Sequence, residues 1–209
     1  CTILQCAREA KCDRVIYSST SASYGLKNKI PLKESMNRDC LNPYSVTKCG
    51  GEDLCQMYHD LFGLKTVIFR YFNVYGPRQP LRGEYAPVIG LFLRQSYNNL
   101  PMTIVGDGNQ KRDFTHVSDV VSANLNAMKT KKPSAFGEIF NIGSGKQYSI
   151  NELAQIIGTA VEYIDERPGE ARNSLADISK ARQTLSYNPD KNLKEWLLQE
   201  LENHHKENK

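Results

Sequence analysis

A helix begins at the stretch Asn42-Pro43-Tyr44-Ser45-Val46-Thr47-Lys48, and the rest of the chain can be assigned outward from it. Asn42 is a favourable N-cap, and proline suits the first helical position, where its missing N–H would have no partner. Apolar residues at helical spacing continue to Phe62, and Gly63 is a typical helix end. The pattern therefore predicts a helix over residues 43–62.

Short apolar runs lie on both sides of this helix. Residues 14–17 precede it and residues 66–70 follow it, and each run is typical of a short buried strand. Residues 2–10 are typical of the end of a preceding helix. A strand, a helix and a second strand form a βαβ unit, which implies a parallel sheet with a ligand crevice at the carboxyl ends of its strands.

The pattern changes beyond Gly76-Pro77 to a more loop-rich region over residues 77–201. We expect this region to be a second, smaller unit whose late elements return to the first sheet. Its predicted elements are helices at 88–97, 117–128, 151–157 and 193–201 and strands at 102–105 and 138–142. Residues 202–209 are expected to fray.

Composition excludes several classes of protein. Apolar residues make up 40% of the 209 positions, and 27 basic residues against 23 acidic ones leave a net charge of +4 with no continuous basic stripe. No apolar run approaches the roughly 18 to 20 residues that span a bilayer, and the residues from Cys1 onward do not show the charged-then-apolar pattern of a signal segment. We therefore expect a soluble, cytoplasmic protein without a nucleic-acid or membrane partner. Its six cysteines show no metal-ligand spacing, so we expect reduced thiols and no metal.

Tyr44 and Lys48 are the first candidates for chemistry. They lie one helical turn apart and project from the same face of the predicted helix. A lysine ammonium beside a phenol stabilises the phenolate, which can exchange a proton with a substrate hydroxyl. Such a pair also arises by chance in a chain with this many tyrosines and lysines, as Tyr187 and Lys191 show, but Pro189 disfavours a helix at that second pair.

Hydroxyl groups follow the first predicted strand, at the edge where the crevice is expected. Ser18-Ser19-Thr20 comes directly after Tyr17, and a hydroxyl there could bridge a substrate hydroxyl and Tyr44. The alternative interpretation of these residues is an ordinary Ser/Thr turn or helix cap.

Several motifs in order resemble the UDP-glucose/UDP-N-acetylglucosamine 4-epimerases, which belong to the extended short-chain dehydrogenase/reductase family. The motifs are Ser18-Ser19-Thr20-Ser21-Ala22-Ser23-Tyr24-Gly25, Pro43-Tyr44-Ser45-Val46-Thr47-Lys48 and Arg70-Tyr71-Phe72-Asn73-Val74-Tyr75-Gly76-Pro77-Arg78. The likeness continues through 106–114, 140–143 and 167–170 to Ala176-Asp177.

The resemblance implies an α/β fold and a cofactor. Residues 1–76 would be the C-terminal half of an NAD-binding, Rossmann-like parallel sheet, and 77–201 a mixed α/β substrate-binding region. In these enzymes a tyrosine takes the proton of the sugar 4-hydroxyl while hydride passes to NAD, and return of hydride to the other face of the 4-keto sugar inverts C4. The full-length enzymes are homodimers that pack through the helix corresponding to 43–62.

The resemblance also assigns roles around the cofactor. Tyr44 would be the base, Lys48 would favour its phenolate and hold the nicotinamide ribose, and Thr20, with Ser19 nearby, would relay the hydroxyl proton. Cofactor contacts would come from Ser18, Tyr44, Lys48, Tyr71 and Phe72.

A site for a nucleoside diphosphate needs positively charged side chains. Guanidinium groups match the negative phosphate oxygens with paired hydrogen bonds. Arg112 and Arg167 are the expected phosphate ligands. By the resemblance, Asn73 would bind a phosphate or sugar oxygen and Glu170 the ribose hydroxyls. The small side chain of Ser174 should leave room for a 2-acetamido group, so we expect UDP-N-acetylglucosamine to be accepted.

The sequence shows no glycine-rich dinucleotide-binding turn. Gly143-Ser144-Gly145-Lys146 follows a strand but lacks the third glycine, so we interpret it as an ordinary loop. In the family this fingerprint lies upstream of the segment that resembles Cys1 onward, which suggests that roughly 100 residues of such an enzyme are absent here. We therefore expect the 209 residues alone neither to bind NAD tightly nor to catalyse.

Two other functions remain open on the sequence. A nucleotide-sugar dehydratase or a UDP-uronate decarboxylase would share the tyrosine–lysine pair and the arginines. Dehydratases use an acidic pair just after the catalytic hydroxyl, whereas Ser21-Ala22 stand there, so the decarboxylase is the better alternative. A non-catalytic fragment that binds sugar nucleotides is the third hypothesis.

Overall fold

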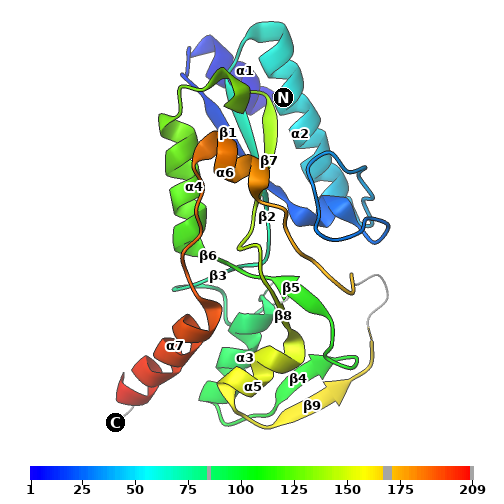
Figure 1. The fold of residues 1–209 in the computed structure, drawn as a ribbon, viewed down its shortest axis with the longest axis vertical. Helices are drawn as coiled ribbons and strands as arrows, with labels where there is room; N and C mark the ends of the chain where they lie inside the picture. The colour runs from blue at the N-terminus through cyan, green and yellow to red at the C-terminus, as the bar shows by residue number, and fades with distance from the viewer. Residues whose placement is uncertain (84–85, 167–170, 208–209) are drawn as a thin grey trace.

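A three-stranded parallel sheet forms the centre of the upper part of the molecule (Figure 1). The computed structural model describes residues 1–83, 86–166 and 171–207. The sheet contains β1 (Val15–Thr20), β2 (Thr66–Tyr71) and β7 (Glu138–Ile142) in the order β1-β2-β7. Because all three strands are parallel, their carboxyl ends meet at one edge, as the βαβ pattern predicted.

Helices cover both faces of this sheet. Successive residues of a strand point to opposite faces, so β2 contributes side chains to a core on each side. Val67 and Phe69 join the core formed with α4 (Val117–Lys129) and α6 (Ser179–Leu185). Ile68, between them, joins the core formed with α1 (Thr2–Glu9) and α2 (Pro43–Phe62). Figure 1 shows these two pairs of helices on opposite sides of the strands. The predicted Rossmann-like α/β class is confirmed.

The lower part of the molecule has its own apolar core. Its parallel strand pair is β4 (Met102–Val105) with β9 (Val161–Ile164), and its helices are α3 (Val88–Tyr97), α5 (Ile150–Ile157) and α7 (Leu193–Glu207). The elements α4, β7 and α6 follow parts of this region in sequence but lie on the large sheet.

Very short strand pairs lie where the two parts meet (Figure 1). β3 (Val74–Tyr75) pairs with β6 (Thr115–His116) in parallel, and β5 (Lys111–Asp113) pairs with β8 (Gln147–Ser149) antiparallel. The 3₁₀ turns η1 (Ser21–Tyr24) and η2 (Pro133–Ala135) complete the elements. Strands of two or three residues are too short to carry a hydrophobic period, so the sequence analysis did not find them.

The ends of α2 confirm the signals from which it was predicted. Asn42 Oδ1 accepts a hydrogen bond from the Ser45 amide at 2.8 Å, and Pro43 is the first helical residue. Gly63 ends the helix with a φ of 68°, in the left-handed region that favours glycine. α2 also carries exposed apolar side chains, among them Leu61, and homodimerisation through this helix stays a prediction.

The C-terminal helix is longer than expected. α7 continues to Glu207, so the prediction of a frayed tail is wrong up to that residue. Two contacts hold the last turns: the His204 ring stacks on the Tyr97 ring with centroids 3.7 Å apart, and Lys206 pairs with Glu202 at 2.7 Å. Among the described residues, no helix combines the length and apolarity that crossing a membrane requires.

A buried ion pair fixes α2 on the sheet. Glu52 on α2 is fully buried, and Arg70 on β2 is 1% exposed. Arg70 donates from Nε and Nη2 to the two oxygens of Glu52, at 2.9 and 2.7 Å. Ser19 Oγ on β1 donates to Glu52 Oε1 at 2.5 Å, so this carboxylate joins α2 to both neighbouring strands.

We expect Glu52→Gln to lower the free energy of unfolding by about 3 to 5 kcal/mol, because it leaves the Arg70 guanidinium buried without its counter-charge. Urea denaturation followed by circular dichroism measures the change. The matched control is Asp53→Asn, the next residue on α2, whose side chain is 63% exposed and whose pairing with Arg38 should contribute little. Equal losses in both variants would contradict this account.

Candidate active site

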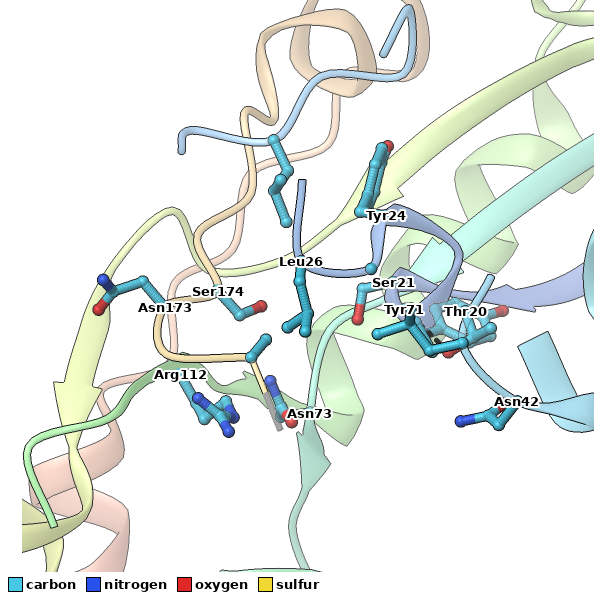
Figure 2. Close-up of a pocket in the computed structure, with 15 residues that line it drawn as sticks. Thr20, Ser21, Tyr24, Leu26, Asn42, Tyr71, Asn73, Arg112, Asn173 and Ser174 are labelled. Atoms are coloured by element: carbon cyan, nitrogen blue, oxygen red, sulfur yellow. Dashed lines mark hydrogen bonds between the residues drawn. The ribbon is translucent and has the colours of Figure 1, made fainter. Parts of the chain in front are cut away.

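A cavity of about 410 Å³ opens at the carboxyl ends of β1 and β2. Figure 2 shows the side chains of five predicted site residues around it: Thr20, Tyr71, Asn73, Arg112 and Ser174. They come from segments that are far apart in the sequence. These segments are the ends of β1 and β2, the strand β5 and the chain after residue 171, and all of them border the cavity. The predicted crevice therefore exists where the parallel strands end.

Tyr44 and Lys48 lie on the helix that begins next to this cavity. Leu41 and Asn42 line the cavity and lead directly into the first turn of α2, which carries Tyr44. Lys48 Nζ donates to the carbonyl oxygen of Ser18 at 2.7 Å and lies 5.9 Å from the centroid of the Tyr44 ring. The Tyr44 residue is 54% exposed, so its hydroxyl can meet a bound molecule.

The three hydroxyls of β1 do not share one environment. The strand extends through Thr20, where it pairs with Tyr71, so its side chains alternate between the faces of the sheet. Ser18 is exposed and Thr20 lines the cavity, while Ser19 is 3% exposed and donates to buried Glu52. The predicted role of Ser19 beside the proton relay is corrected: its hydroxyl is committed to the interior of the fold.

Thr20 lines the cavity, and its role as a proton relay stays a prediction. Its Oγ1 accepts a hydrogen bond from the Ala22 amide at 3.1 Å, which caps the short 3₁₀ turn that follows. A threonine hydroxyl that accepts this bond still has its own proton to donate. The cap interpretation and the relay interpretation of this residue are therefore compatible.

Tyr24 also lines the cavity, but its environment differs from that of Tyr44. The residue is 1% exposed, and its hydroxyl donates to Asn141 Oδ1 at 2.6 Å. Burial raises the pKa of Tyr24 to about 12, although nearby Arg70 acts in the opposite direction. The Tyr24 hydroxyl is thus committed to a buried hydrogen bond, whereas the Tyr44 side chain is open to a bound molecule.

The two aromatic residues predicted to contact the cofactor lie in different environments: one lines the cavity and the other is buried in the core. Tyr71 lines the cavity, and its hydroxyl oxygen accepts a hydrogen bond from Asn124 Nδ2 at 3.0 Å. Phe72 is fully buried and packs in the core near Tyr24, with ring centroids 6.3 Å apart. The predicted contact of Phe72 with the nicotinamide is therefore corrected, because its ring is on the core side of the chain.

The substrate side of the cavity is built from Asn73, Arg112 and Ser174. Asn73 has a φ of 22°, in the left-handed region that asparagine tolerates, and its Nδ2 donates to the Asp113 carbonyl at 2.9 Å. Arg112 Nη1 donates to the Lys111 carbonyl at 3.1 Å, and the Ser174 amide donates to that same carbonyl at 3.0 Å. The predicted ligands Arg167 and Glu170 lie outside the described residues.

A buried carboxylate organises this side. Asp113 accepts hydrogen bonds from the Ser144 amide and hydroxyl, both at 2.7 Å, and from the amides of Gly145 and Ala176, at 3.0 and 3.1 Å. Burial raises the pKa of Asp113, and these bonds oppose that effect. The amides of the loop 143–146 thus bind a carboxylate of this same chain, which agrees with its interpretation as an ordinary loop.

Charge in the cavity favours an anion. Its described lining includes the guanidinium of Arg112 and contains no carboxylate side chain. Beyond Asn73 and Arg112 lies a second cavity of about 310 Å³. Six of its ten described lining residues are apolar, Val88 and Leu91 of α3 among them, and the sequence analysis did not find it. Within the described part of the chain, no cluster of His, Cys, Asp and Glu could hold a metal ion.

Gly51 is a site residue that the sequence analysis missed. A Cβ on Gly51 would come within 2.1 Å of the Tyr17 hydroxyl oxygen, so the Tyr17 ring can lie against α2 here only because this position has no side chain. The Tyr17 hydroxyl donates to the Lys48 carbonyl at 3.3 Å across the same contact. The available signal was Gly50-Gly51 in the middle of a predicted helix, where glycine is unfavourable.

Comparisons with known proteins agree with this geometry. The family model described as the NAD dependent epimerase/dehydratase family matches residues 1–143. The chain belongs to this family. A protein of Methanocaldococcus jannaschii that is provisionally named a UDP-glucose 4-epimerase is 40% identical over 203 residues, which cover 93% of this chain and 64% of that protein.

Solved structures share the whole described fold. The UDP-N-acetylglucosamine 4-epimerase of Methanobrevibacter ruminantium M1, in complex with UDP-N-acetylmuramic acid, has a TM-score of 0.90 and 34% identity, over 99% of this chain and 67% of that one. The UDP-glucuronic acid 4-epimerase of Bacillus cereus, with UDP-glucuronic acid and NAD, has a TM-score of 0.86 and 37% identity, over 98% and 65%. This chain thus spans about two thirds of each.

A decarboxylase is also similar to the chain. The UDP-N-acetyl-alpha-D-glucosaminuronate decarboxylase of Bacillus cytotoxicus is 36% identical over 225 residues, which cover 96% of this chain and 68% of that protein. The similarity therefore extends beyond epimerases to a second reaction on UDP-sugars.

We expect Gly51→Ala to destabilise the fold, because its new methyl group would collide with the Tyr17 ring and force α2 away from β1. Thermal unfolding followed by circular dichroism measures the effect. The neighbouring Gly50→Ala is the matched control: a Cβ there meets nothing within 4 Å, so it should raise stability by up to about 1 kcal/mol. A stabilising Gly51→Ala would show that α2 does not need this close approach.

Proposed function

We propose that the protein acts as a UDP-sugar 4-epimerase, which interconverts UDP-glucose and UDP-galactose and also the corresponding 2-acetamido sugars through a 4-keto intermediate and bound NAD. One observation carries the proposal: the helix that carries exposed Tyr44 and nearby Lys48 begins directly after Leu41 and Asn42, which line a cavity together with Thr20 and Arg112. The similarity to several UDP-sugar 4-epimerases supports it.

The two cavities suit the length of a nucleotide sugar. Arg112 and Asn73 border both, so a diphosphate held there would place its sugar in the 410 Å³ cavity and its nucleoside in the 310 Å³ cavity. The second cavity combines apolar side chains with polar ones such as Thr103 and Gln110, a lining that suits a flat base with polar edges. Arg167 and Glu170, outside the described residues, are proposed to complete the contacts to the phosphates and the ribose.

Proton transfer would use residues of this chain alone. The sugar 4-hydroxyl would donate to Tyr44, directly or through the Thr20 hydroxyl, which faces the same cavity. The Lys48 ammonium stabilises the phenolate that accepts this proton, and the same tyrosine returns the proton when the 4-keto group is reduced. Tyr71 would form part of the wall against which the sugar turns.

The exposed side of the site fits the nicotinamide end of NAD. Lys48 uses one hydrogen bond on the Ser18 carbonyl, and an ammonium group has three N–H donors, so it can also hold ribose hydroxyls. Ser18 and Tyr44 are exposed beside it. When bound, NAD supplies the hydride acceptor and donor. The other contacts to the cofactor would have to come from outside the residues described.

We expect Tyr44→Phe to lower kcat for UDP-galactose formation by about 10² to 10⁴, the usual contribution of a general acid–base group, with little change in KM. A coupled assay on the complete gene product with NAD in excess measures both constants. Tyr163→Phe is the matched control, because Tyr163 is exposed to the same degree, 55% against 54%, but lies on β9 away from the cavity. Full activity of Tyr44→Phe would remove the basis of the proposal.

Acceptance of the 2-acetamido sugar should depend on Ser174. Its side chain lines the sugar cavity and is small, so Ser174→Tyr is expected to lower kcat/KM for UDP-N-acetylglucosamine at least tenfold more than for UDP-glucose. The same assay with each substrate gives the ratio. Ser179→Tyr, at an exposed position on α6 outside this cavity, should leave the ratio unchanged. An unchanged ratio for Ser174→Tyr would show that this residue does not set the width of the pocket.

A UDP-uronate decarboxylase is the second candidate, and the similarity to the Bacillus cytotoxicus decarboxylase favours it. Both reactions pass through a 4-keto sugar, so the same tyrosine–lysine pair would serve. Release of CO₂ from a UDP-uronate, without conversion of UDP-glucose, would decide for the decarboxylase. The absence of a carboxylate from the described cavity lining argues against a dehydratase, which needs an acidic pair.

A further inference from the structure

Two cysteine thiols meet beside the helix that carries the tyrosine–lysine pair. Cys40 Sγ and Cys49 Sγ lie 3.3 Å apart, and both thiols are free. Cys49 directly follows Lys48 on α2, and Cys40 lies two residues before the N-cap Asn42. Cys49 is 5% exposed, whereas Cys40 is half-buried and can be reached from solvent.

The segment that carries Cys40 already joins α2 to the wall of the cavity. Arg38 pairs with Asp53 and Glu52 of α2, at 2.6 and 3.2 Å. The Asp39 carboxylate accepts a hydrogen bond from the amide of Leu26, a residue that lines the cavity, at 2.9 Å. A covalent bond at Cys40 would therefore act on a connection between the helix and the cavity wall.

We propose that Cys40 and Cys49 form a redox modification site that reacts with low-molecular-weight disulfides, such as oxidised glutathione, and closes into an intramolecular disulfide. The distance carries the inference, because the sulfurs need to approach by only about 1.3 Å to reach the bonded separation of about 2.0 Å. Thiol pairs of this kind in reducing compartments act as transient redox sensors.

The exposures of the two thiols set the order of the steps. The Cys40 thiolate attacks one sulfur of oxidised glutathione, a Cys40–glutathione bond forms, and the first glutathione leaves and takes up the proton that Cys40 lost. Cys49 then attacks Cys40 Sγ, gives up its proton and displaces the second glutathione. Two protein thiols are oxidised, one glutathione disulfide is reduced, and two glutathione thiols are released.

Burial makes the second step dependent on the first. Burial and the contact with Cys40 raise the pKa of Cys49 to about 12, while the Arg38 guanidinium acts in the opposite direction. A thiol of this kind reacts poorly with a reagent in solution, but it already touches the sulfur that it would attack. The ring closed by the disulfide runs from residue 40 to 49 and contains Asn42, Tyr44 and Lys48.

The test uses the chain with its three exposed cysteines replaced, Cys1→Ser, Cys6→Ser and Cys12→Ser, which leaves Cys40, Cys49 and Cys55. Incubation with oxidised glutathione is expected to remove two of the three thiols that can be titrated after denaturation. The intact mass should show no retained glutathione, peptide mapping should show a Cys40–Cys49 link, and dithiothreitol should restore all three thiols. A glutathione that stays on Cys40, or no reaction, would overturn the proposal.

Two further variants in this background test whether the disulfide requires Cys49 specifically or any thiol of the helix. Cys49→Ala removes the resolving thiol, so one glutathione should accumulate on Cys40. Cys55→Ala is the matched control, because Cys55 is as buried as Cys49 on the same helix but is not in contact with Cys40 in the described contacts, and the pair should still close. A link that needs Cys55 would contradict the assignment.

Hydrogen exchange gives a readout that does not depend on activity. The amides of Ser45 and Val46 both donate to Asn42, one to its side chain and one to its carbonyl. Because the disulfide encloses this first turn of α2, their exchange should slow several-fold on oxidation and recover on reduction. Unchanged or faster exchange would show that the bond does not restrain the turn that carries Tyr44.

Discussion

The buried carboxylate of Glu52 is the interaction on which the rest of the site depends. It receives two hydrogen bonds from Arg70 on β2 and one from Ser19 on β1, so a single side chain of α2 is tied to both strands. Lys48 lies one helical turn before Glu52, and its ammonium contacts the Ser18 carbonyl, next to the serine that Glu52 binds. A buried ion pair adds little net stability compared with an apolar contact, but it is sensitive to geometry. Its effect here is to place Tyr44 relative to the end of β1.

On the substrate side, a second buried carboxylate holds separate segments of the chain together. Asp113 collects four hydrogen bonds from Ser144, Gly145 and Ala176, and thereby fixes the end of β5 against two loops. Arg112 precedes it, and Asn73 binds its carbonyl. The two halves of the candidate site are therefore positioned by separate polar centres. The first centre lies beneath the end of β1, and the second lies beside Arg112, whose side chain lines the cavity.

Much of the fold could be predicted, because long helices and buried strands carry a period and defined ends: α2, α3 and β4 have the predicted bounds. The site was predicted less completely. Thr20, Tyr71, Asn73, Arg112 and Ser174 do meet at one cavity. Ser19 and Phe72 were misplaced, because the face that a side chain takes is decided by strand pairing and not by its neighbours in sequence. Glu52 could not be singled out, since an acidic residue on a helix is usually exposed.

The misplacement of Ser19 shows what the register of β1 controls. A slip of β1 by one residue against β2 would exchange the faces, with Ser19 turned to the crevice and Thr20 to the interior. Three serine and threonine residues in a row offer almost no difference in hydrophobicity to oppose such a slip. The apolar residues earlier in the strand do oppose it, because Ile16 packs in the core with α4 and α6 while Val15 and Tyr17 pack in the core with α1 and α2, and a slip would exchange these faces. The choice of Thr20 as the hydroxyl in the cavity therefore follows from the register that the apolar start of β1 sets.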